Sequence, residues 1–408
     1  MKKRNKFCLK NLSYESQKKW IRLREQVHDL YYVHKLSKRS ISERLKVSLN
    51  FVLKWTKEGE MDFSIDNRGW KNGKGRKWTK NDLRRISEIH RQLSKNKDSF
   101  FCGATAIQQA WIKKYKTESP PLRTIGWMLK ELGLSGALKE KTNKGAARYL
   151  CYPEHSIHHY AGKRVLEVDF IGKKFIKGQT APIHFAAASF KYEPKLRYYE
   201  IVASESADCL MKFLRTVFVK FEKPDVVKMD NGFAMSGTAP QPRVLSKLPL
   251  WLLQQQVIPM YAVPRKPFSQ ASIEGNNSVF GRKFWNRFEF RNTTEIKKKL
   301  KLFNKASLQY YQYKPSSNSI KNKKKFIPKI FYLRQVREDE KEKAFIEVAH
   351  EKIPLPKTYL NYFVMAEWKL KTEKLTIFIE KNEKLKKIKT LSFKLNEKSK
   401  QKLFNKKQ

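Results

Sequence analysis

Residues 165–170 read Val-Leu-Glu-Val-Asp-Phe, a stretch of strand-forming residues that carries a carboxylate, Asp169. A second stretch, residues 225–233, reads Asp-Val-Val-Lys-Met-Asp-Asn-Gly-Phe and ends its apolar run at Asp230. An aspartate in an apolar strand is costly unless a partner compensates its charge. These two acids are therefore the first candidates for a functional site.

The segments around these acids alternate between strand and helix patterns. Period-two apolar stretches predict strands over 164–171, 183–190, 196–203, 225–229 and 257–263. Helical spacing predicts helices over 204–221, 243–255 and from 269 to about 311, the last as one long helix or a helix pair. This order predicts an α/β domain over 161–312, a mixed sheet with helices on both faces.

A third acid, Glu274, lies early in the last predicted helix. Carboxylates gathered at one place repel each other and persist only if a cation neutralises them, and all-oxygen ligands suit Mg²⁺ or Mn²⁺. Two such ions about 3.5–4 Å apart can hold the attacking and leaving oxygens of a phosphodiester displacement. Each acid also has a structural interpretation, since Asp-Asn-Gly favours turns and Glu274 suits a helix first turn. Taken together, the three acids favour a metal site.

The order Asp169, Asp230, Glu274 resembles the DDE catalytic core of retroviral-integrase-like transposases of bacterial insertion sequences, which has an RNase H-like fold. Asp-Asn-Gly at 230–232 resembles the "DNG" step of that family. Residues 264–274, Pro-Arg-Lys-Pro-Phe-Ser-Gln-Ala-Ser-Ile-Glu, resemble its P-R-x-P-x-x-N-G-x-V-E segment, and Asn277 follows the glutamate at the family's distance. Two departures are Gln-Ala in place of Asn-Gly at 270–271 and a longer spacing between the second and third acids.

The resemblance implies a transposase that cuts DNA at transposon ends to leave a 3′-OH and then joins this 3′-OH to target DNA. It implies that Asp169, Asp230 and Glu274 are the catalytic residues and hold two Mg²⁺ or Mn²⁺ ions. Because two ends must be joined, at least two copies of the chain are expected to act together. The alternative is a DNA-binding regulator with a catalytically silent RNase H-like core. A pure binder has no reason to keep three carboxylates beside phosphate.

The charge of the chain agrees with a DNA partner. Its 408 residues include 88 Lys and Arg against 38 Asp and Glu, a formal net charge of +50, and self-repulsion on this scale requires a polyanion. An anionic membrane is less favoured, because no amphipathic stretch carries basic residues on one face only. Without the pattern of a signal peptide, a long apolar run or a paired CxxC motif, we expect a cytoplasmic, nucleoid-associated bacterial protein without membrane contact.

Two helical units are predicted before the core, a helix-turn-helix over 1–65 and a second over 76–138. In the first, Ser40 and Glu43 form a predicted capping box and Ser48 caps a third helix. In the second, Ser-Pro-Pro at 119–121 is predicted to start the last helix and Gly133 to end it. A helical bundle that only packs is the alternative. The residues expected to contact DNA are Asn50, Lys54, Lys57, Arg123, Thr124 and Lys130 in these units and Arg265, Lys266, Asn277, Arg282 and Lys283 beside the acids.

The remaining segments are predicted as connections and a C-terminal domain. Residues 139–160 form a basic linker, where Cys151, His155, His158 and His159 could bind zinc but lack paired spacing, so a linker or DNA-backbone contact is favoured. Short strands separated by turns predict a small SH3-like β-barrel over 328–392, followed by a frayed basic tail over 393–408. Glu167 shares a strand face with Asp169 and is considered as an auxiliary metal ligand.

Overall fold

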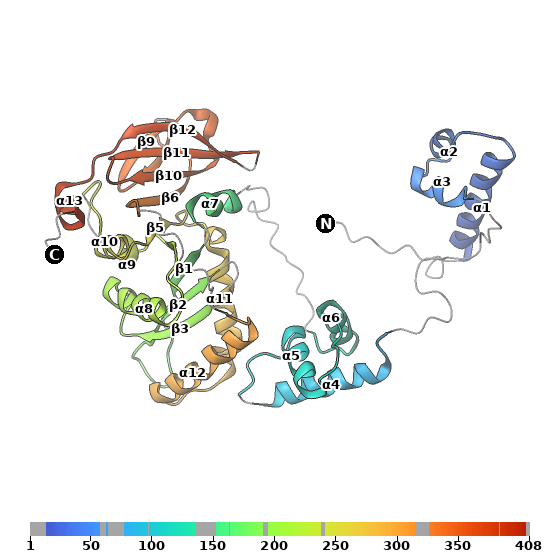
Figure 1. Cartoon of the computed structure of the whole chain (residues 1–408), viewed down its shortest axis with the longest axis horizontal. Coiled ribbons are helices and arrows are strands. Elements are labelled where there is room, and N and C mark those ends of the chain that lie inside the picture. Colours follow the sequence, from blue (N-terminus) through green and yellow to red (C-terminus); the bar gives the residue numbers. More distant parts are fainter. Residues whose placement is uncertain are drawn as a thin grey trace. The chain divides into compact units, whose positions relative to one another are not determined.

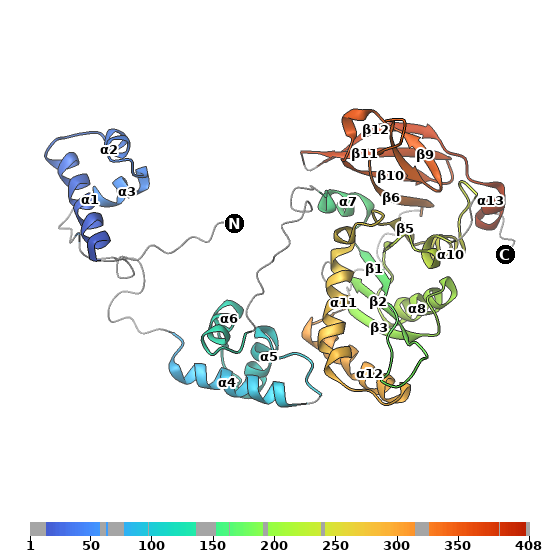
Figure 2. The same cartoon turned by 180° about the vertical axis from the view of Figure 1, so that it is seen from behind.

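The structure is a computed structural model that describes residues 14–57, 63, 77–96, 98–135, 152–162, 164–190, 195–237, 241–314, 326–382 and 384–404. Its internal contacts divide the chain into two units, residues 1–83 and 84–408. The larger unit contains a mixed α/β core with the segments that the sequence singles out (Figures 1 and 2). In the part of the chain described, no helix is long and apolar enough to cross a membrane.

The first unit contains α1 (Tyr14–Tyr32), α2 (Lys38–Arg44) and α3 (Leu49–Trp55) around a small apolar core. The core is formed by Val27, Ile41, Val52 and Trp55. Ser48 caps α3 as predicted, because its hydroxyl accepts a hydrogen bond from the amide of Phe51 at 3.3 Å. The predicted capping box is wrong. The cap of α2 is Ser37, whose hydroxyl accepts from the Ser40 amide at 3.2 Å, so Ser40 lies inside the helix.

Three further helices follow, α4 (Lys80–Lys95), α5 (Ala104–Tyr115) and α6 (Leu122–Glu131). The start of α6 differs from the prediction, since its N-cap is Pro121 and no side chain caps it. Its end agrees, because Gly133 has φ +66° and the Leu134 amide donates to the Leu129 carbonyl at 2.8 Å. A glycine suits this left-handed position, which residues with a Cβ adopt only under strain.

The core is a mixed sheet of nine strands among the described residues, in the order β12-β11-β10-β6-β5-β4-β1-β2-β3. The predicted strands are β1 (Val165–Phe170), β2 (His184–Phe190), β3 (Arg197–Val202), β4 (Val226–Met229) and β5 (Ile258–Tyr261). Strand β1 pairs antiparallel with β2 and parallel with β4. All four residues of β4 are buried, as expected for a parallel strand covered on both faces.

Helices cover both faces of this sheet, as the sequence predicts (Figures 1 and 2). On one face, α8 (Ala207–Lys220) and α10 (Lys247–Gln254) pack on Leu166 and Val168 of β1. On the other, α11 (Ala271–Lys283) and α12 (Thr293–Tyr310) pack on Phe185 and Ala187 of β2. Because side chains alternate along a strand, Asp169 lies on the face covered by α11.

The C-terminal strands differ from the expected separate barrel. Strand β6 (Lys329–Gln335) pairs parallel with β5, and β10 (Phe363–Lys369), β11 (Lys374–Lys381) and β12 (Lys384–Ser392) continue the same sheet. A second sheet of β7 (Arg337–Glu338), β8 (Ala344–Val348) and β9 (Glu351–Pro354) packs on the same apolar core. The barrel over 328–392 is therefore not confirmed, and these strands complete the core.

Two segments expected to be irregular are helices. The predicted tail contains α13 (Glu397–Phe404), where the Ser399 hydroxyl accepts a hydrogen bond from the Leu245 amide at 3.0 Å. The predicted linker contains α7 (Glu154–Ala161), whose Ile157 and Ala161 pack against Val165 and Val226. Both helices are held by contacts far away in sequence, so a local pattern does not reveal them.

Candidate active site

The two aspartates lie at the carboxyl ends of neighbouring parallel strands. The register pairs Leu166 with Val227 and Glu167 with Lys228. Continued by two residues, this register sets Asp169 opposite Asp230, both half-buried. Carboxyl ends of parallel strands are the usual position for ligands in open α/β sheets.

The pKa of Asp169 responds to the two other acids. Burial raises the pKa of Asp169 to about 7, and the negative charges of Asp230 and Glu274 add to this rise. Burial also raises the pKa of Asp230, against the opposing effect of a hydrogen bond from the Gly232 amide at 2.9 Å. Like charges held near each other favour protonation or a bound cation. The charges of Asp230 and Glu274 therefore both act on the Asp169 carboxyl.

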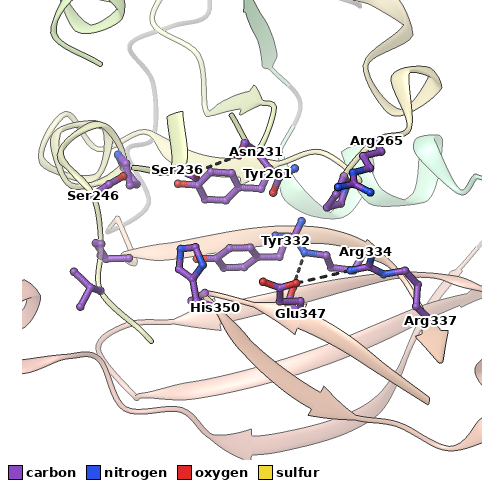
Figure 3. Close-up of a pocket in the computed structure, with 15 residues that line it drawn as sticks. Asn231, Ser236, Ser246, Tyr261, Arg265, Tyr332, Arg334, Arg337, Glu347 and His350 are labelled. Atoms are coloured by element: carbon purple, nitrogen blue, oxygen red, sulfur yellow. Dashed lines mark hydrogen bonds and ion pairs between the residues drawn. The ribbon is translucent and has the colours of Figure 1, made fainter. Parts of the chain in front are cut away.

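The Asp-Asn-Gly turn has a local structural reason. A Cβ on Gly232 would lie 3.1 and 3.2 Å from the two carboxylate oxygens of Asp230, so a larger residue would press on this carboxylate. The Asn231 side chain donates to the Ala262 carbonyl at 2.7 Å. The Ser236 hydroxyl donates to the Asn231 carbonyl at 3.0 Å (Figure 3). These bonds hold the turn against the end of β5.

Helix α11 carries Glu274 in its first turn and follows a 3₁₀ helix, η3 (Pro267–Gln270). The departure from the family motif is visible here, because Gln270 is the N-cap and its side chain makes no capping bond. Side-chain hydrogen bonds of Asn276 and Asn277 help to hold the helix to the sheet. Asn277 Nδ2 donates to Asp169 Oδ2 at 2.8 Å, and the Tyr199 hydroxyl donates to Asn276 Oδ1 at 2.6 Å. Glu274 itself is exposed.

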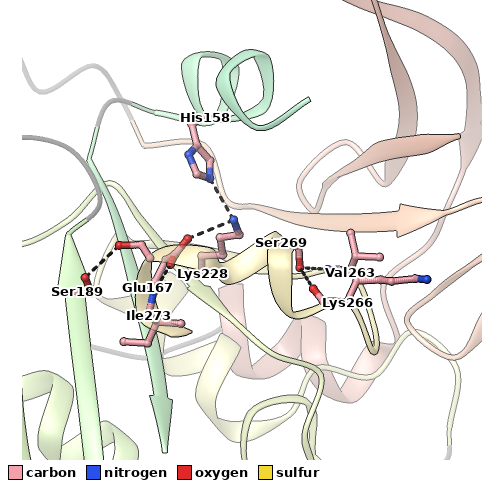
Figure 4. A network of polar contacts seen from close by, with 9 residues as sticks. His158, Glu167, Ser189, Lys228, Val263, Lys266, Ser269 and Ile273 are labelled. Carbon is pink, nitrogen blue, oxygen red and sulfur yellow. Dashed lines mark hydrogen bonds and ion pairs between the residues drawn. The ribbon is translucent and has the colours of Figure 1, made fainter. Parts of the chain in front are cut away.

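A buried ion pair lies beside the aspartates on the same strands (Figure 4). Lys228 Nζ is 3.3 Å from Glu167 Oε1, and both side chains are 0% exposed. The other oxygen of Glu167 accepts a hydrogen bond from the Ile273 amide at 2.9 Å, at the start of α11. Glu167 is thus engaged with Lys228 and α11, which argues against a role as a metal ligand.

His158, weighed as a zinc ligand or a linker residue, belongs to this network. It is buried in α7, with its Nε2 3.3 Å from Lys228 Nζ (Figure 4). Cys151 and the side chain of His155 lie outside the described residues. The segment around His158 is thus part of the core's packing, which corrects its assignment to an irregular linker.

The three acids are the candidate ligands of a divalent metal ion. The donor set suits Mg²⁺ or Mn²⁺, because it consists of carboxylate oxygens whose mutual repulsion a cation would relieve. Within the described residues, however, no three His, Cys, Asp or Glu side chains lie close enough together to hold a metal ion. The strand register brings two carboxylates side by side, and Glu274 is coupled to Asp169 through its charge.

The residues predicted to contact DNA occupy several elements. Next to the acids, Arg265 and Arg282 are exposed, Lys266 and Lys283 are half-buried, and Asn277 bonds Asp169. On α6, Arg123 and Lys130 are exposed and Thr124 is half-buried. In the first unit, Asn50 and Lys57 are exposed, and the Lys54 ammonium lies 4.8 Å from the centre of the Trp55 ring.

Sequence reasoning missed Lys228 and the contact that His158 makes with it. A signal for Lys228 was available, because a lysine in an apolar strand two residues before Asp230 parallels a glutamate two residues before Asp169. No comparable signal existed for the contact of His158, which depends on where α7 packs.

Comparisons with known proteins give matches among solved structures only; no family model and no curated protein matches this chain. A simian T-cell lymphotropic virus intasome in complex with PP2A regulatory subunit B56 gamma matches with 10% identity over 46% of this chain and 69% of that chain, at a TM-score of 0.32. The Mos1 strand transfer complex matches with 11% identity over 72% of this chain and 92% of that chain, at a TM-score of 0.25. The mariner Mos1 paired end complex with Mg matches with 12% identity over 71% of this chain and 93% of that chain, at a TM-score of 0.19.

All three TM-scores are below 0.5. These similarities therefore give no information about what this chain does.

Proposed function

We propose that this chain is a transposase that cuts DNA at transposon ends and transfers the cut strand to a target. The observation that carries the proposal is the strand register that sets Asp169 opposite Asp230 at the carboxyl edge of the sheet, with the charge of Glu274 also acting on Asp169. Further inside the same strands, Glu167 is paired with Lys228. The strands are therefore already joined by a charge-compensated pair, and the like charges at the edge are not needed for folding. Their residue types suit divalent cations and phosphodiester chemistry.

In this proposal Asp169, Asp230 and Glu274 are the residues that would hold two Mg²⁺ or Mn²⁺ ions. Bound cations of this kind polarise a phosphodiester and lower the pKa of an attacking hydroxyl. Asn277 holds the Asp169 carboxylate in one orientation through its 2.8 Å hydrogen bond. Arg265, Lys266, Arg282 and Lys283 would neutralise phosphates of the DNA backbone beside these acids.

The helical units before the core would bind the transposon ends. Arg123 and Lys130 are exposed on α6, and Asn50 and Lys57 are exposed on or beside α3, where a helix-turn-helix presents residues to a major groove. Two ends must meet one target, so at least two copies of the chain would act on paired ends. A DNA-binding regulator with a silent core is the second candidate. It is favoured by the observation that, among the described residues, no three His, Cys, Asp or Glu side chains lie close enough together to hold a metal ion.

The test uses the full chain, Mg²⁺ and a plasmid carrying the DNA that flanks its coding region on both sides. Asp169→Asn, Asp230→Asn and Glu274→Gln keep the shape of each side chain and remove its charge. Each should lower strand cleavage and strand transfer by at least about 10³-fold, which corresponds to several kcal/mol of lost transition-state stabilisation. Binding to the same DNA should be retained.

Asp208→Asn is the matched control, because it makes the same chemical change at a side chain that is 60% exposed on α8. It should cut at the wild-type rate. Normal cleavage by Glu274→Gln would contradict the three-carboxylate site. DNA binding without any cleavage by the wild-type chain would favour the regulator.

A further inference from the structure

The second helical unit is packed against the core, although the sequence predicts it as a separate DNA-binding unit. Internal contacts assign residues 84–408 to one unit and leave α1 to α3 in the other. The contacts that join α4 and α5 to the core come from residues 98–101, which lie between these two helices, and from Gln109 on α5. Residues 98–101 are therefore the anchor segment of the second helical unit.

The anchor segment contacts the core through two aromatic rings. Phe100 is buried, and its ring centre lies 5.8 Å from that of Phe288 and 5.0 Å from that of Phe303. Phe101 stacks on Tyr310 with ring centres 4.3 Å apart and planes 18° apart. Aromatic pairs of this kind contribute stability beyond the area that they bury. Since Phe303 and Tyr310 belong to α12, the anchor segment is fixed to a helix of the core.

Polar contacts cap one helix end on each side of this contact. Arg287 of the core donates to the Ser99 carbonyl at 2.5 Å and to the Asn96 carbonyl at 3.3 Å, just after the end of α4. Gln109 of α5 donates to the Tyr310 carbonyl at 3.2 Å, at the end of α12. Carbonyls at the C-terminal end of a helix have no partner within the helix, so these bonds satisfy them. The bonds fix the direction in which α4 and α5 leave the core.

Packing continues from the anchor segment to α6. Lys114 of α5 pairs with Glu88 of α4 at 3.0 Å. Gln108 of α5 donates to the Pro120 carbonyl, just before α6, at 3.3 Å. The exposed basic residues of α6 are therefore carried by a body that is joined to the core.

Packing also continues from the anchor segment to the helix that carries the third acid. Phe303 contacts Phe280 of α11, with ring centres 6.2 Å apart, and α11 carries Glu274 in its first turn. Burial, and in addition the charge of Lys283 at the end of α11, lower the pKa of His90 on α4. Helices α4 and α11 thus lie within electrostatic range of each other.

We propose that the anchor segment and Gln109 fix the second helical unit on the core of the same chain, so that duplex DNA bound by α6 passes the carboxylate edge at one spacing. Phe101, Gln109 and Arg287 are then positioning residues, which act through α6 and α11 and not on the reacting atoms. The proposal rests on the proposed function, because it uses the roles given there to α6 and to the three acids. Two binding surfaces in one rigid body meet a single DNA with a geometry that a free linker does not hold.

The first measurement maps DNA contacts without cleavage. Full-length Asp169→Asn protein is bound to the flanking DNA without Mg²⁺ or Mn²⁺, and protected nucleotides are mapped by hydroxyl-radical footprinting. The protein should protect two stretches at a fixed spacing. The first stretch is identified by its loss in Arg123→Ala and the second by its loss in Arg282→Ala.

The combination of Phe101→Ala with Gln109→Ala removes the stacked ring and the bond to α12. This double variant should keep the first stretch and weaken protection of the second at least about fivefold, because the core is no longer held over the DNA. With Asp169 intact and Mg²⁺ present, the share of cuts at the wild-type position should fall at least about fivefold, since misplaced reacting groups lose rate. Phe101→Tyr keeps the ring and should retain both the footprint and the cut position.

Phe290→Ala is the matched control, because it removes a buried ring of the same aromatic cluster that contacts Phe284 and Trp285 of the core. It should lower the unfolding temperature and leave the footprint and the cut position unchanged. Thermal unfolding of each variant checks that the fold is retained. A double variant that fails to fold is replaced by Arg287→Met, which removes the two hydrogen bonds to the end of α4.

Wild-type protection of the second stretch in the double variant would overturn the proposal, as would an equal loss in Phe290→Ala. A wild-type footprint that contains only the first stretch would also overturn it. The footprint requires no cleavage, so the two proposals can fail separately. A chain that never cuts DNA but loses the second stretch in the double variant would contradict the proposed function alone.

Discussion

Two neighbouring rows of residues on β1 and β4 differ in charge although they share the same strands. In the inner row, Glu167 and Lys228 have opposite charges, lie 3.3 Å apart and are fully buried. In the outer row, two residues further along, Asp169 and Asp230 carry like charges and are half-buried. The inner row also binds α7 through His158 and α11 through the Ile273 amide.

The inner row stabilises the fold, whereas the outer row destabilises it. A buried ion pair with further hydrogen bonds compensates its own desolvation and fixes how four elements meet. Two like charges at the edge lower stability, because each raises the free energy of ionising the other. Such a cost persists in a sequence when the residues have another use, and this supports a functional interpretation of the outer row. Four predictions test the contrast.

The largest effect is expected in the inner row. Lys228→Met leaves the Glu167 carboxylate buried without its cation, which should lower the free energy of unfolding of the core by about 3–5 kcal/mol in urea denaturation. The double variant with Glu167→Gln should recover most of this loss. Lys247→Met is the control, since its partner Asp208 is exposed and such pairs contribute about 0–1 kcal/mol. A loss in Lys228→Met no larger than in this control would show that the inner row is not structural.

In the outer row, removal of a charge should stabilise the metal-free protein. The pKa of Asp169 is raised from 3.8 to about 7, so the folded state holds a proton that the unfolded state has released between these pH values. Stability contributed by this group therefore falls as pH rises from about 4 to 7. Asp169→Asn should raise the free energy of unfolding by roughly 2–4 kcal/mol above pH 7 and leave it unchanged below pH 4.

The measurement is urea unfolding at pH 4, 6 and 8, with Asp208→Asn as the control that shows no pH-dependent gain. A stability difference between Asp169→Asn and wild type that does not change with pH would contradict the raised pKa.

Divalent cations should stabilise the outer row specifically. At a Mn²⁺ concentration of 100 times its dissociation constant, binding to the folded state adds about 2.7 kcal/mol. Thermal unfolding of wild type should shift upward with Mn²⁺, and that of Asp169→Asn should not. Lys228→Met offers a comparison, because it keeps Asp169, Asp230 and Glu274 and should still respond if it folds. An equal shift in Asp169→Asn would place the cation elsewhere.

The smallest effect concerns the orientation of Asp169. Asn277→Ala removes the 2.8 Å hydrogen bond that lowers the pKa of this carboxyl. The pKa should therefore rise further, measured by carbon NMR titration of the aspartate, and the free energy of unfolding should fall by about 1 kcal/mol at pH 8. Ser278→Ala, at an exposed position of the same helix, should change neither quantity. An unchanged pKa would show that Asn277 does not hold the carboxylate.

The local pattern of the sequence was sufficient for the elements around the acids. Strands β1 to β5 and helices α8, α10, α11 and α12 follow the predicted periodicities, because burial of one face imposes spacing that a sequence displays directly. The proximity of Asp169 and Asp230 could also be predicted, since both end apolar strands in an α/β order.

Only the tertiary structure decided which distant segments meet. Pairing of β6 with β5 makes the C-terminal strands a continuation of the sheet instead of the expected separate barrel. Docking of α7 placed His158 beside Lys228. Helix α2 has its N-cap at Ser37 and not at Ser40. Both serines are suitable N-cap residues by sequence, and the backbone conformation decides between them. Each of these features depends on contacts between residues far apart in the chain, or on a choice between equivalent local signals. The contacts contribute their free energy only in the assembled core, so the local sequence does not reveal them.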